Sequence, residues 1–403
     1  MNILRWFISK TVREACVVHK HYRRLLASQS DVLSAQAIGP VQAALDSLKS
    51  TINTGANKGA IRIKAEELQF AAEKWLKPYP NATWRENVEV LLVALAVAMA
   101  IRTFFLQPFK IPTGSMQPTL FGVTSKNYLA PGNNPNFQIP TGWERIKEFF
   151  EGISYIDVVA QNDGAIEDIS QPVGIKLINF WQRFRLGGHE YTIWFPPDYG
   201  EAPPNADALA YRAGLSRDHY YHKGDHVIKL RLAAGDHLFV DRLTYNFRKP
   251  ERGEIVVFAT VGTEIPQQDQ FYIKRLVALP GEKVQIGDDR HLRINGVRLD
   301  ASTPHFANVY GFDPKDPPRE SQYSGHVNGT VDTKFGLIPN LAPRFPDEQT
   351  VFDNSGNNYM VMGDNTCNSY DSRSWGTFPA NNVIGKSFFV YWPLTTRFGW
   401  GNQ

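Results

Sequence analysis

Ser115 lies in a segment whose neighbours restrict the local backbone. The run PFKIPTGSMQPTL at 108–120 surrounds this serine with prolines and a glycine, which favour an extended approach and a tight turn. A rigid, exposed hydroxyl of this kind suits a nucleophile. On this pattern alone an ordinary loop serine remains the favoured interpretation, because a serine nucleophile also needs a base.

Histidine is the usual base, and four histidines are candidates by position. His219, His222, His226 and His237 lie in or beside a block with little clear periodicity. The spacing of the first three could suggest zinc, but neither a matching cysteine nor a helical context accompanies them. We therefore predict no metal site.

Lys274 offers a second kind of base. In the run FYIKRLVAL at 271–279, strand alternation places this lysine on a face with apolar neighbours. Burial there would disfavour the ammonium form and leave an amine that accepts a proton near neutral pH. An edge-strand lysine whose stem packs while its head reaches water fits the same pattern.

Small polar groups, two acids and an arginine are concentrated in GDNTCNSYDSRSWG at 363–376. One interpretation is a turn held by an Asp–Arg pair. The other is a scaffold that orients a catalytic group through hydrogen bonds.

Composition excludes several classes of protein. The 403 residues include 43 Lys+Arg and 40 Asp+Glu, so the net charge of +3 does not favour a nucleic-acid binder. The only cysteines, Cys16 and Cys367, cannot build a disulfide scaffold. A mean hydropathy of −0.33 excludes a polytopic membrane protein but permits a single span.

One segment is apolar enough to be that span. Residues 90–101 (VLLVALAVAMAI) carry no charge, and with Glu89 and Arg102 reaching outward, about 84–106 can cross a bilayer. A buried core helix is the alternative. Residues 1–89 contain 13 Lys/Arg and 8 Asp/Glu, which favours a cytoplasmic tail. Close to the span the charge bias nearly vanishes, so composition alone leaves the topology open.

The flanking regions differ in texture. Residues 1–83 predict a helical region, with a basic amphipathic helix at 2–26 and further helices near 31–50 and 60–77. After the span, short strand-like runs predict antiparallel β structure, with a hairpin turn at Asn295-Gly296. Between these runs and the serine segment, residues 122–234 form a block rich in aromatics and proline, with a helix near 143–151.

Together these segments resemble type I signal peptidase, the bacterial leader peptidase. Four motif regions match in family order: a serine box (108–120), a β box (GDHLFVDRLTYNFRKPERGEIVVF, 235–258), a lysine box (FYIKRLVALPGEKV, 271–284) and a GDN box (363–376). The apolar lead-in ending IRTFFLQPF is similar to the family's membrane anchor. Several long motifs in order are far more specific than one short match.

The resemblance implies a Ser–Lys dyad protease that removes signal peptides from exported preproteins. Ser115 would attack the scissile carbonyl, with Lys274 as general base and then general acid. The Ser115 N–H and the Thr113 hydroxyl would form the oxyanion hole. The family often has serine where Thr113 stands, and threonine keeps the hydroxyl.

The resemblance also implies supporting residues. Ser369 would form a hydrogen bond with Lys274. Asp371 would form an ion pair with Arg373. Arg275 is a further supporting residue. The preprotein would bind as an added β-strand. The residues expected to contact it are Phe109, Ile111, Met116 and Ile273.

The predicted architecture is mainly β: a helical region (1–83), one transmembrane helix (84–106) and an antiparallel β catalytic domain (107–121 and 235–403), interrupted by an insertion (122–234). The resemblance places it in the bacterial inner (cytoplasmic) membrane as a single-pass protein with its catalytic domain outside the cytoplasm. Its partners would be preproteins, membrane lipid and the secretion machinery, with no nucleic acid. No metal, nucleotide or flavin cofactor is implied.

Two rival functions follow from other classes of protein. A catalytically inactive membrane-anchored binding protein could share the fold, although Ser115, Lys274 and Ser369 are intact. A self-cleaving Ser–Lys repressor would be soluble and carry a DNA-binding module, and the sequence suggests neither feature.

Overall fold

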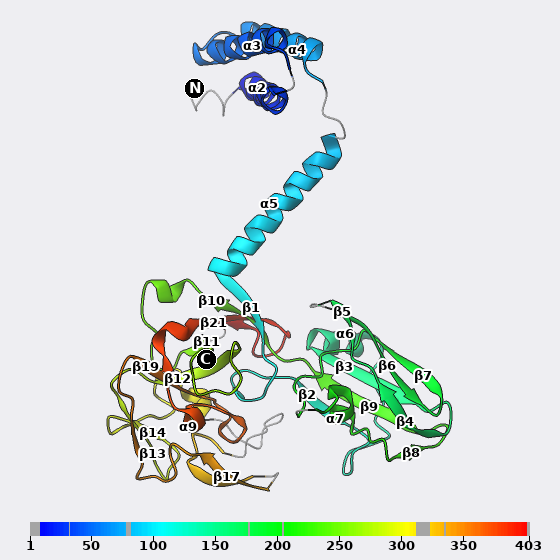
Figure 1. Ribbon diagram of the computed structural model, residues 1–403, viewed down its shortest axis with the longest axis vertical. Coiled ribbons are helices and arrows are strands. Elements are labelled where there is room, and N and C mark those ends of the chain that lie inside the picture. The colour runs from blue at the N-terminus through cyan, green and yellow to red at the C-terminus, as the bar shows by residue number, and fades with distance from the viewer. Residues whose placement is uncertain are drawn as a thin grey trace. The chain divides into compact units, whose positions relative to one another are not determined.

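The computed structural model describes residues 9–31, 33–77, 82–175, 178–203, 205–311, 323–333 and 336–400. The chain divides into two compact units, Met1–Val97 and Ala98–Gln403, and each is considered by itself (Figure 1).

The first unit contains three helices, α2 (Lys10–Gln29), α3 (Ala35–Asn53) and α4 (Lys58–Trp75). Their buried faces share one apolar cluster, which includes Val41, Leu48 and other aliphatic side chains. The helical region expected here is therefore present, and residues 54–57 separate α3 from α4. The beginning of the amphipathic helix predicted at 2–26 lies outside the described residues.

Helix α5 (Ala82–Phe104) carries the apolar segment. Its portion Trp84–Phe104 has a mean hydropathy of 1.8, is long enough to cross a membrane, and is 0% buried inside the structure. A core helix would be covered by other parts of the protein, so this exposure argues against the core-helix alternative.

The main β-sheet of the second unit is antiparallel throughout and has eight strands. Its order is β1-β10-β21-β11-β12-β19-β20, with β22 paired to β21. The strands are β1 (Leu106–Lys110), β10 (His237–Asp241), β11 (Ile255–Ala259), β12 (Phe271–Ala278), β19 (Asn358–Met362), β20 (Phe378–Pro379), β21 (Val383–Trp392) and β22 (Gly399–Trp400). Apolar clusters lie on both sides of it, so the sheet is the framework of this part of the chain.

A smaller sheet of order β15-β14-β13-β18 shares an apolar cluster with β12 and β19 of the main sheet. Asn295 and Gly296 have φ angles of +50° and +82° and join β14 to β15, which confirms the predicted hairpin turn. The remaining elements are β13 (Lys283–Ile286), β14 (Leu292–Ile294), β15 (Val297–Arg298), β16 (Gly329–Thr333), β17 (Gly336–Ala342), β18 (Val351–Asp353), α8 (Ala307–Tyr310) and α9 (Ser372–Trp375), with short 3₁₀ turns η1 (Thr244–Asn246), η2 (Thr366–Asn368) and η3 (Ala380–Asn382).

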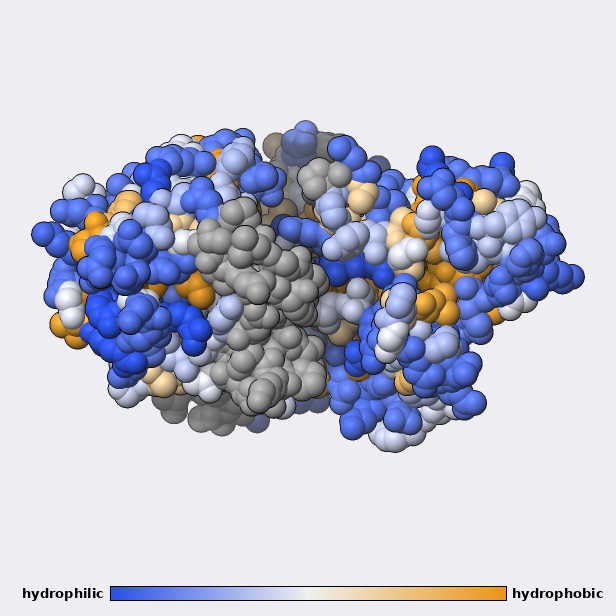
Figure 2. Space-filling view, turned by 90° about the horizontal axis from the view of Figure 1, so that it is seen from below, coloured by the Kyte–Doolittle hydropathy of each residue, from blue (hydrophilic) through white to orange (hydrophobic). Residues whose placement is uncertain are grey.

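The segment between β1 and β10 is also mainly β. It forms one sheet of order β2-β9-β3 and another of order β5-β6-β4-β8, with β7 paired to β6, around an apolar cluster of its own. Its elements are β2 (Thr124–Asn127), α6 (Gly142–Phe150), β3 (Ile153–Val159), β4 (Gly164–Ile169), β5 (Val173–Ile175), β6 (Ile178–Leu186), β7 (His189–Trp194), α7 (Ala208–Ala213), β8 (Tyr220–Tyr221) and β9 (His226–Ala233). Figure 2 shows mostly hydrophilic residues on one face of the molecule, with hydrophobic residues gathered toward the side of this segment.

Candidate active site

Ser115 follows β1 in a loop that the ends of the inserted segment hold in place. The N–H of Ile111 donates to the carbonyl of Asp236 at 2.9 Å. Gly122 packs so closely on the backbone of Thr113 that a Cβ at this position would overlap it. The backbone before the serine is therefore fixed by Gly122, the first residue of the insertion, and by Asp236, just after its end.

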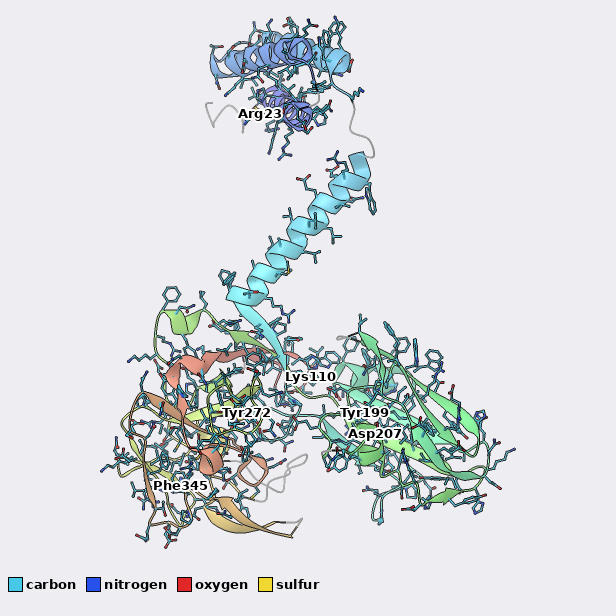
Figure 3. The ribbon with its side chains drawn as sticks, viewed as in Figure 1. Arg23, Lys110, Tyr199, Asp207, Tyr272 and Phe345 are labelled. Atoms are coloured by element: carbon cyan, nitrogen blue, oxygen red, sulfur yellow. The ribbon has the colours of Figure 1, made fainter. Side chains whose placement is uncertain are left out.

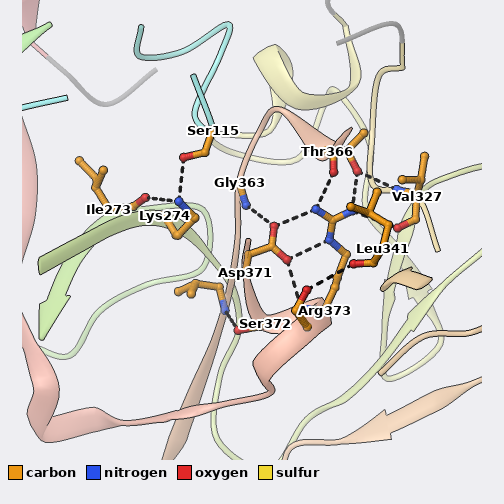
Figure 4. Close-up of polar contacts among 12 residues, drawn as sticks. Ser115, Ile273, Lys274, Val327, Leu341, Gly363, Thr366, Asp371, Ser372 and Arg373 are labelled. Atoms are coloured by element: carbon orange, nitrogen blue, oxygen red, sulfur yellow. Dashed lines mark hydrogen bonds and ion pairs between the residues drawn. The ribbon is translucent and has the colours of Figure 1, made fainter. Parts of the chain in front are cut away.

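Lys274 in β12 reaches the serine directly (Figure 4). Its Nζ lies 2.7 Å from Oγ of Ser115 and 3.1 Å from the carbonyl oxygen of Ile273. The exposed fractions of Ser115 and Lys274 are only 6% and 5%. The Thr113 hydroxyl lies 3.4 Å from the Oγ of Ser115. The pair is thus in hydrogen-bond contact and almost closed to water.

Burial lowers the pKa of Lys274 to about 8, because the ammonium form loses its hydration. The charges of Asp371, Asp364 and Glu201 raise this pKa, and that of Arg373 lowers it. At mildly alkaline pH a large fraction of the amine is neutral and has a free electron pair. A neutral amine 2.7 Å from a hydroxyl can accept its proton.

Asn365 connects the GDN segment to the serine loop. Its backbone N–H donates to the carbonyl of Ser115 at 3.0 Å, and its side-chain amide donates to the carbonyl of Gly114 at 2.9 Å. Gly363 lies against the same loop, and a Cβ there would overlap the hydroxyl of Ser369. The lack of a side chain at Gly363 allows the two segments to approach this closely.

Arg275, next to the lysine, forms a buried network that joins three segments. Its guanidinium binds both carboxylate oxygens of Asp364, at 2.8 and 2.6 Å, and donates to the carbonyl of Gly253. Asp364 also accepts from the hydroxyl of Thr119 at 2.5 Å. Arg275 and Asp364 are fully buried, so this bidentate pair fixes β12 against the serine segment.

Asp371 and Arg373 form a second buried pair, with two contacts of 2.9 Å (Figure 4). Arg373 also donates to the hydroxyl of Thr366 at 2.7 Å, and Asp371 accepts from the N–H of Gly363. Burial by itself would raise the pKa of Asp371, but the charge of Arg373 and these hydrogen bonds hold it below its usual value. The pair is ionised and stabilises the turn that begins α9.

Ser369 is buried near this pair, with an exposed fraction of 6%. Among the described residues its hydroxyl has no hydrogen bond of good geometry, although it lies close enough to Asp371 to help lower that pKa. The hydrogen bonds described for the amine of Lys274 are those to Ser115 and Ile273. The expected hydrogen bond from Ser369 to the lysine therefore stays a prediction.

The four residues expected to contact substrate belong to one apolar cluster beside the serine. Ile111 and Met116 are buried in it, and Phe109 and Ile273 pack against it while partly exposed. Phe109 and Phe271 bring β1 and the start of β12 together, with ring centroids 5.5 Å apart.

Among the described residues, the side-chain hydrogen bonds of Ser115 involve Lys274 and Thr113 and none of the four histidines considered as alternatives. His226 pairs with Asp157 at 2.7 Å within the inserted segment. Within the described ranges, no three His, Cys, Asp or Glu side chains converge as metal ligands.

Sequence reasoning did not assign roles to Thr119, Asp364 or Asn365, although all three lie inside the quoted motifs. The sequence did contain a signal: the GDN segment carries two acids, and the motifs carry two arginines, Arg275 and Arg373. The structure forms two buried acid–arginine pairs from them, and only the pair of Asp371 and Arg373 was predicted.

Comparison with known families agrees with this geometry. A family model described as "Signal peptidase, peptidase S26" matches residues 84–134 and 221–392, more than half of the chain. This chain belongs to the signal peptidase S26 family. The match includes Ser115, Lys274 and the GDN segment, and it is interrupted at 135–220, within the inserted segment.

Individual relatives extend the same comparison. "Signal peptidase I" of Leptolyngbya laminosa is 30% identical over 166 residues, covering 40% of this chain and 63% of that protein. "Probable signal peptidase I-1" of Synechocystis is 31% identical over 173 residues, covering 42% of this chain and 67% of that protein. This chain thus spans less than two thirds of the Leptolyngbya protein. A signal peptidase I crystal structure from Enterococcus faecalis V583 is 27% identical, covers 34% of this chain and 97% of that chain, and has a TM-score of 0.21.

Proposed function

We propose that this chain is a membrane-anchored serine endopeptidase that cleaves signal peptides from exported preproteins. The observation that carries the proposal is the contact between Ser115 and Lys274, 2.7 Å apart and buried, in a member of the signal peptidase family. A lysine with a lowered pKa beside a serine is a known means of activating the hydroxyl.

The neutral amine of Lys274 takes the proton of the Ser115 hydroxyl as Oγ forms a bond to the scissile carbonyl carbon. The carbonyl oxygen becomes an oxyanion. The backbone N–H of Ser115 and the hydroxyl of Thr113 then stabilise this charge by donating hydrogen bonds. The position of Thr113, 3.4 Å from the nucleophile, supports this role.

Lys274, now an ammonium ion, donates its proton to the leaving amine as the peptide bond breaks. An acyl-enzyme at Ser115 remains. A water molecule then attacks the ester carbonyl while Lys274 accepts its proton. As the tetrahedral intermediate collapses and the bond to Oγ breaks, Lys274 returns this proton to Ser115, and the carboxylic acid leaves.

Strand edges beside the dyad support binding of the preprotein in extended form. β1 is the terminal strand of its sheet. Within the described part of β12, Arg275–Ala278 pair with β19, whereas Phe271–Lys274 pair with β11 alone. Unpaired backbone groups on these edges can hydrogen-bond an added strand. Phe109, Ile111, Met116 and Ile273 would supply its apolar contacts.

The same proposal includes the location of the chain. Helix α5 would span the bacterial inner membrane once, and Ala98–Gln403 would project its β domain to the extracytoplasmic side. The partners would then be preproteins, membrane lipid and the secretion machinery. Ser369, Asp371, Arg373 and Arg275 would position the dyad without taking part in proton transfer.

The test is incubation of the detergent-solubilised full chain with a preprotein. The wild-type chain should release a mature product with a single new N-terminus, and Ser115→Ala should release none. A product that forms equally with Ser115→Ala would contradict the proposal.

A further inference from the structure

One loop of the inserted segment lies beside the proposed catalytic groove. Residues 196–203, called the acidic loop here, follow β7 and precede α7. The carboxylate of Asp198 forms an ion pair with the ammonium group of Lys110, the last residue of β1. Since Lys110 is only five residues before Ser115, this pair ties the acidic loop to the segment that carries the nucleophile.

The acidic loop is also fixed to the body of the insertion. Tyr199 is buried in the apolar cluster of that segment, with an exposed fraction of 4%. Arg212 of α7 donates to the backbone carbonyls of Tyr199, at 2.8 Å, and Glu201, at 3.1 Å. Figure 3 shows Tyr199 and Lys110 near the junction of the two β regions, with Tyr272 of β12 on the opposite side. The loop therefore has a defined position between two anchors.

Glu201 is the free charge of this loop. Its side chain is exposed, and among the described residues its carboxylate has neither a hydrogen bond nor an ion pair. It nevertheless lies close enough to β12 to act electrostatically on two residues of the proposed site, Tyr272 and Lys274. An unpaired carboxylate beside a peptide groove attracts a cationic group and repels an anionic one.

We propose that the acidic loop forms one wall of the peptide groove and that Glu201 is a substrate subsite for a lysine or arginine side chain near the cleavage point. This inference rests on the proposed peptidase function. It gives the insertion a role in substrate choice, because Glu201 belongs to the insertion and not to the β domain.

The pH dependence of cleavage provides a second test of the proposal, because Glu201 acts on the charge of Lys274. The groups that act on its amine are Asp371, Asp364 and Glu201, which raise the pKa, and Arg373, which lowers it. Only Glu201 comes from the insertion. Removal of its charge should lower the pKa of Lys274, and the acid limb of kcat/KM should shift to lower pH.

The experiment compares matched peptides that carry Lys, Gln or Glu at one position at a time on either side of the cut. With the wild-type full chain in detergent, Lys should be preferred over Glu at one position near the cut. Glu201→Gln should reduce this preference by up to about fivefold, the range expected for an exposed ion pair. Asp198→Asn, which releases the loop from Lys110, should reduce it in the same direction.

Glu190→Gln is the matched control, because Glu190 is an exposed acid of the insertion paired with Arg183. It should keep both the preference and the pH profile. The inference is overturned if wild-type enzyme shows no charge preference, or if Glu201→Gln keeps the preference in full. A failure of the proposed function looks different, since then no peptide is cleaved in a Ser115-dependent way.

Discussion

Lys274 and Ser115 are 159 positions apart in the chain, yet their Nζ and Oγ atoms lie 2.7 Å apart in a site nearly closed to water. β12 supplies the lysine and the loop after β1 supplies the serine. These two segments are joined through Asp364 and Asn365, each of which contacts the serine segment.

The first prediction concerns the dyad. Lys274→Ala and Ser115→Ala should each lower kcat/KM by roughly 10⁴- to 10⁶-fold, and the double variant should be hardly worse, because the two groups act as a unit. Rates of peptide cleavage measure this. Lys283→Ala, at an exposed lysine of β13, is the control and should remain active. Substantial cleavage by Lys274→Ala would mean that another group is the base.

The second prediction concerns pH. Lys274 has a pKa lowered to about 8 and must be neutral to act as base. Activity is therefore present above this pH and is lost as the pH falls through it, by about tenfold per unit on the acid limb. Measurement of kcat/KM from neutral to alkaline pH tests the assignment. A profile that is flat over this range would rule out a titrating lysine base.

The third prediction concerns Asn365 as a positioning residue. Asn365→Ala removes the amide that holds the carbonyl of Gly114, so the nucleophile should lose its alignment. We expect kcat to fall about 10- to 100-fold while KM and the acid limb change little, since the surroundings of Lys274 remain.

Asn382→Ala is the matched control for Asn365, because its amide likewise holds backbone carbonyls, those of Ala259 and Val261. It should leave kcat unchanged. An equal loss of kcat in both variants would indicate general destabilisation and would contradict a specific role for Asn365.

The antiparallel β core could be predicted from the sequence because it depends on short, continuous patterns. The role of Ser115 with Lys274 was expected from the resemblance of four motifs, since the pattern around Ser115 alone favoured an ordinary loop serine. Alternation in 271–279 places a lysine among apolar residues, and the structure buries Lys274 and the residues that follow it. One residue separates Asp371 from Arg373, so their ion pair could also be predicted from the sequence.

The pair of Arg275 and Asp364 was not predictable in this way, because 89 positions separate its members. Its formation depends on pairing of β12 with β19, and the sequence does not specify which strands become neighbours.

The strands of the insertion were missed for a different reason. In β6, the polar Gln182 is buried at 1% exposure and donates to the carbonyl of Ser170. Phe180, in the same strand, is 36% exposed. Apolar and polar residues therefore do not alternate cleanly between the inner and outer faces, and the period of two is hidden.

The fourth prediction concerns His326, which is fully buried and whose ring nitrogens have no hydrogen-bond partner within the described ranges. Burial, followed by the charge of Arg373, lowers its pKa to about 3 from 6.5. As the pH falls below 6.5, the unfolded state binds a proton that the folded state does not, so the free energy of unfolding decreases. The slope approaches about 1.4 kcal/mol per pH unit.

His326→Leu should remove this contribution, so that the variant loses less stability than wild type between pH 6.5 and acid conditions. Denaturant midpoints at several pH values measure the difference. His219→Leu, at an exposed histidine of the insertion, should follow wild type. An identical pH dependence in His326→Leu and wild type would show that this imidazole is not held neutral in the folded protein.

The fifth prediction concerns separability of the insertion. Thr124 of β2 pairs with Ala233 of β9, so the two ends of the inserted segment lie side by side. The segment also has an apolar cluster of its own. Replacement of 124–232 by a short Gly/Ser linker should leave a folded chain that cleaves a short peptide slowly. Full preproteins should be processed less well, because the acidic loop is lost. Circular dichroism and cleavage assays measure both effects.

Failure of the shortened chain to fold would mean that contacts such as that between Phe149 and Trp392 are essential to the β domain.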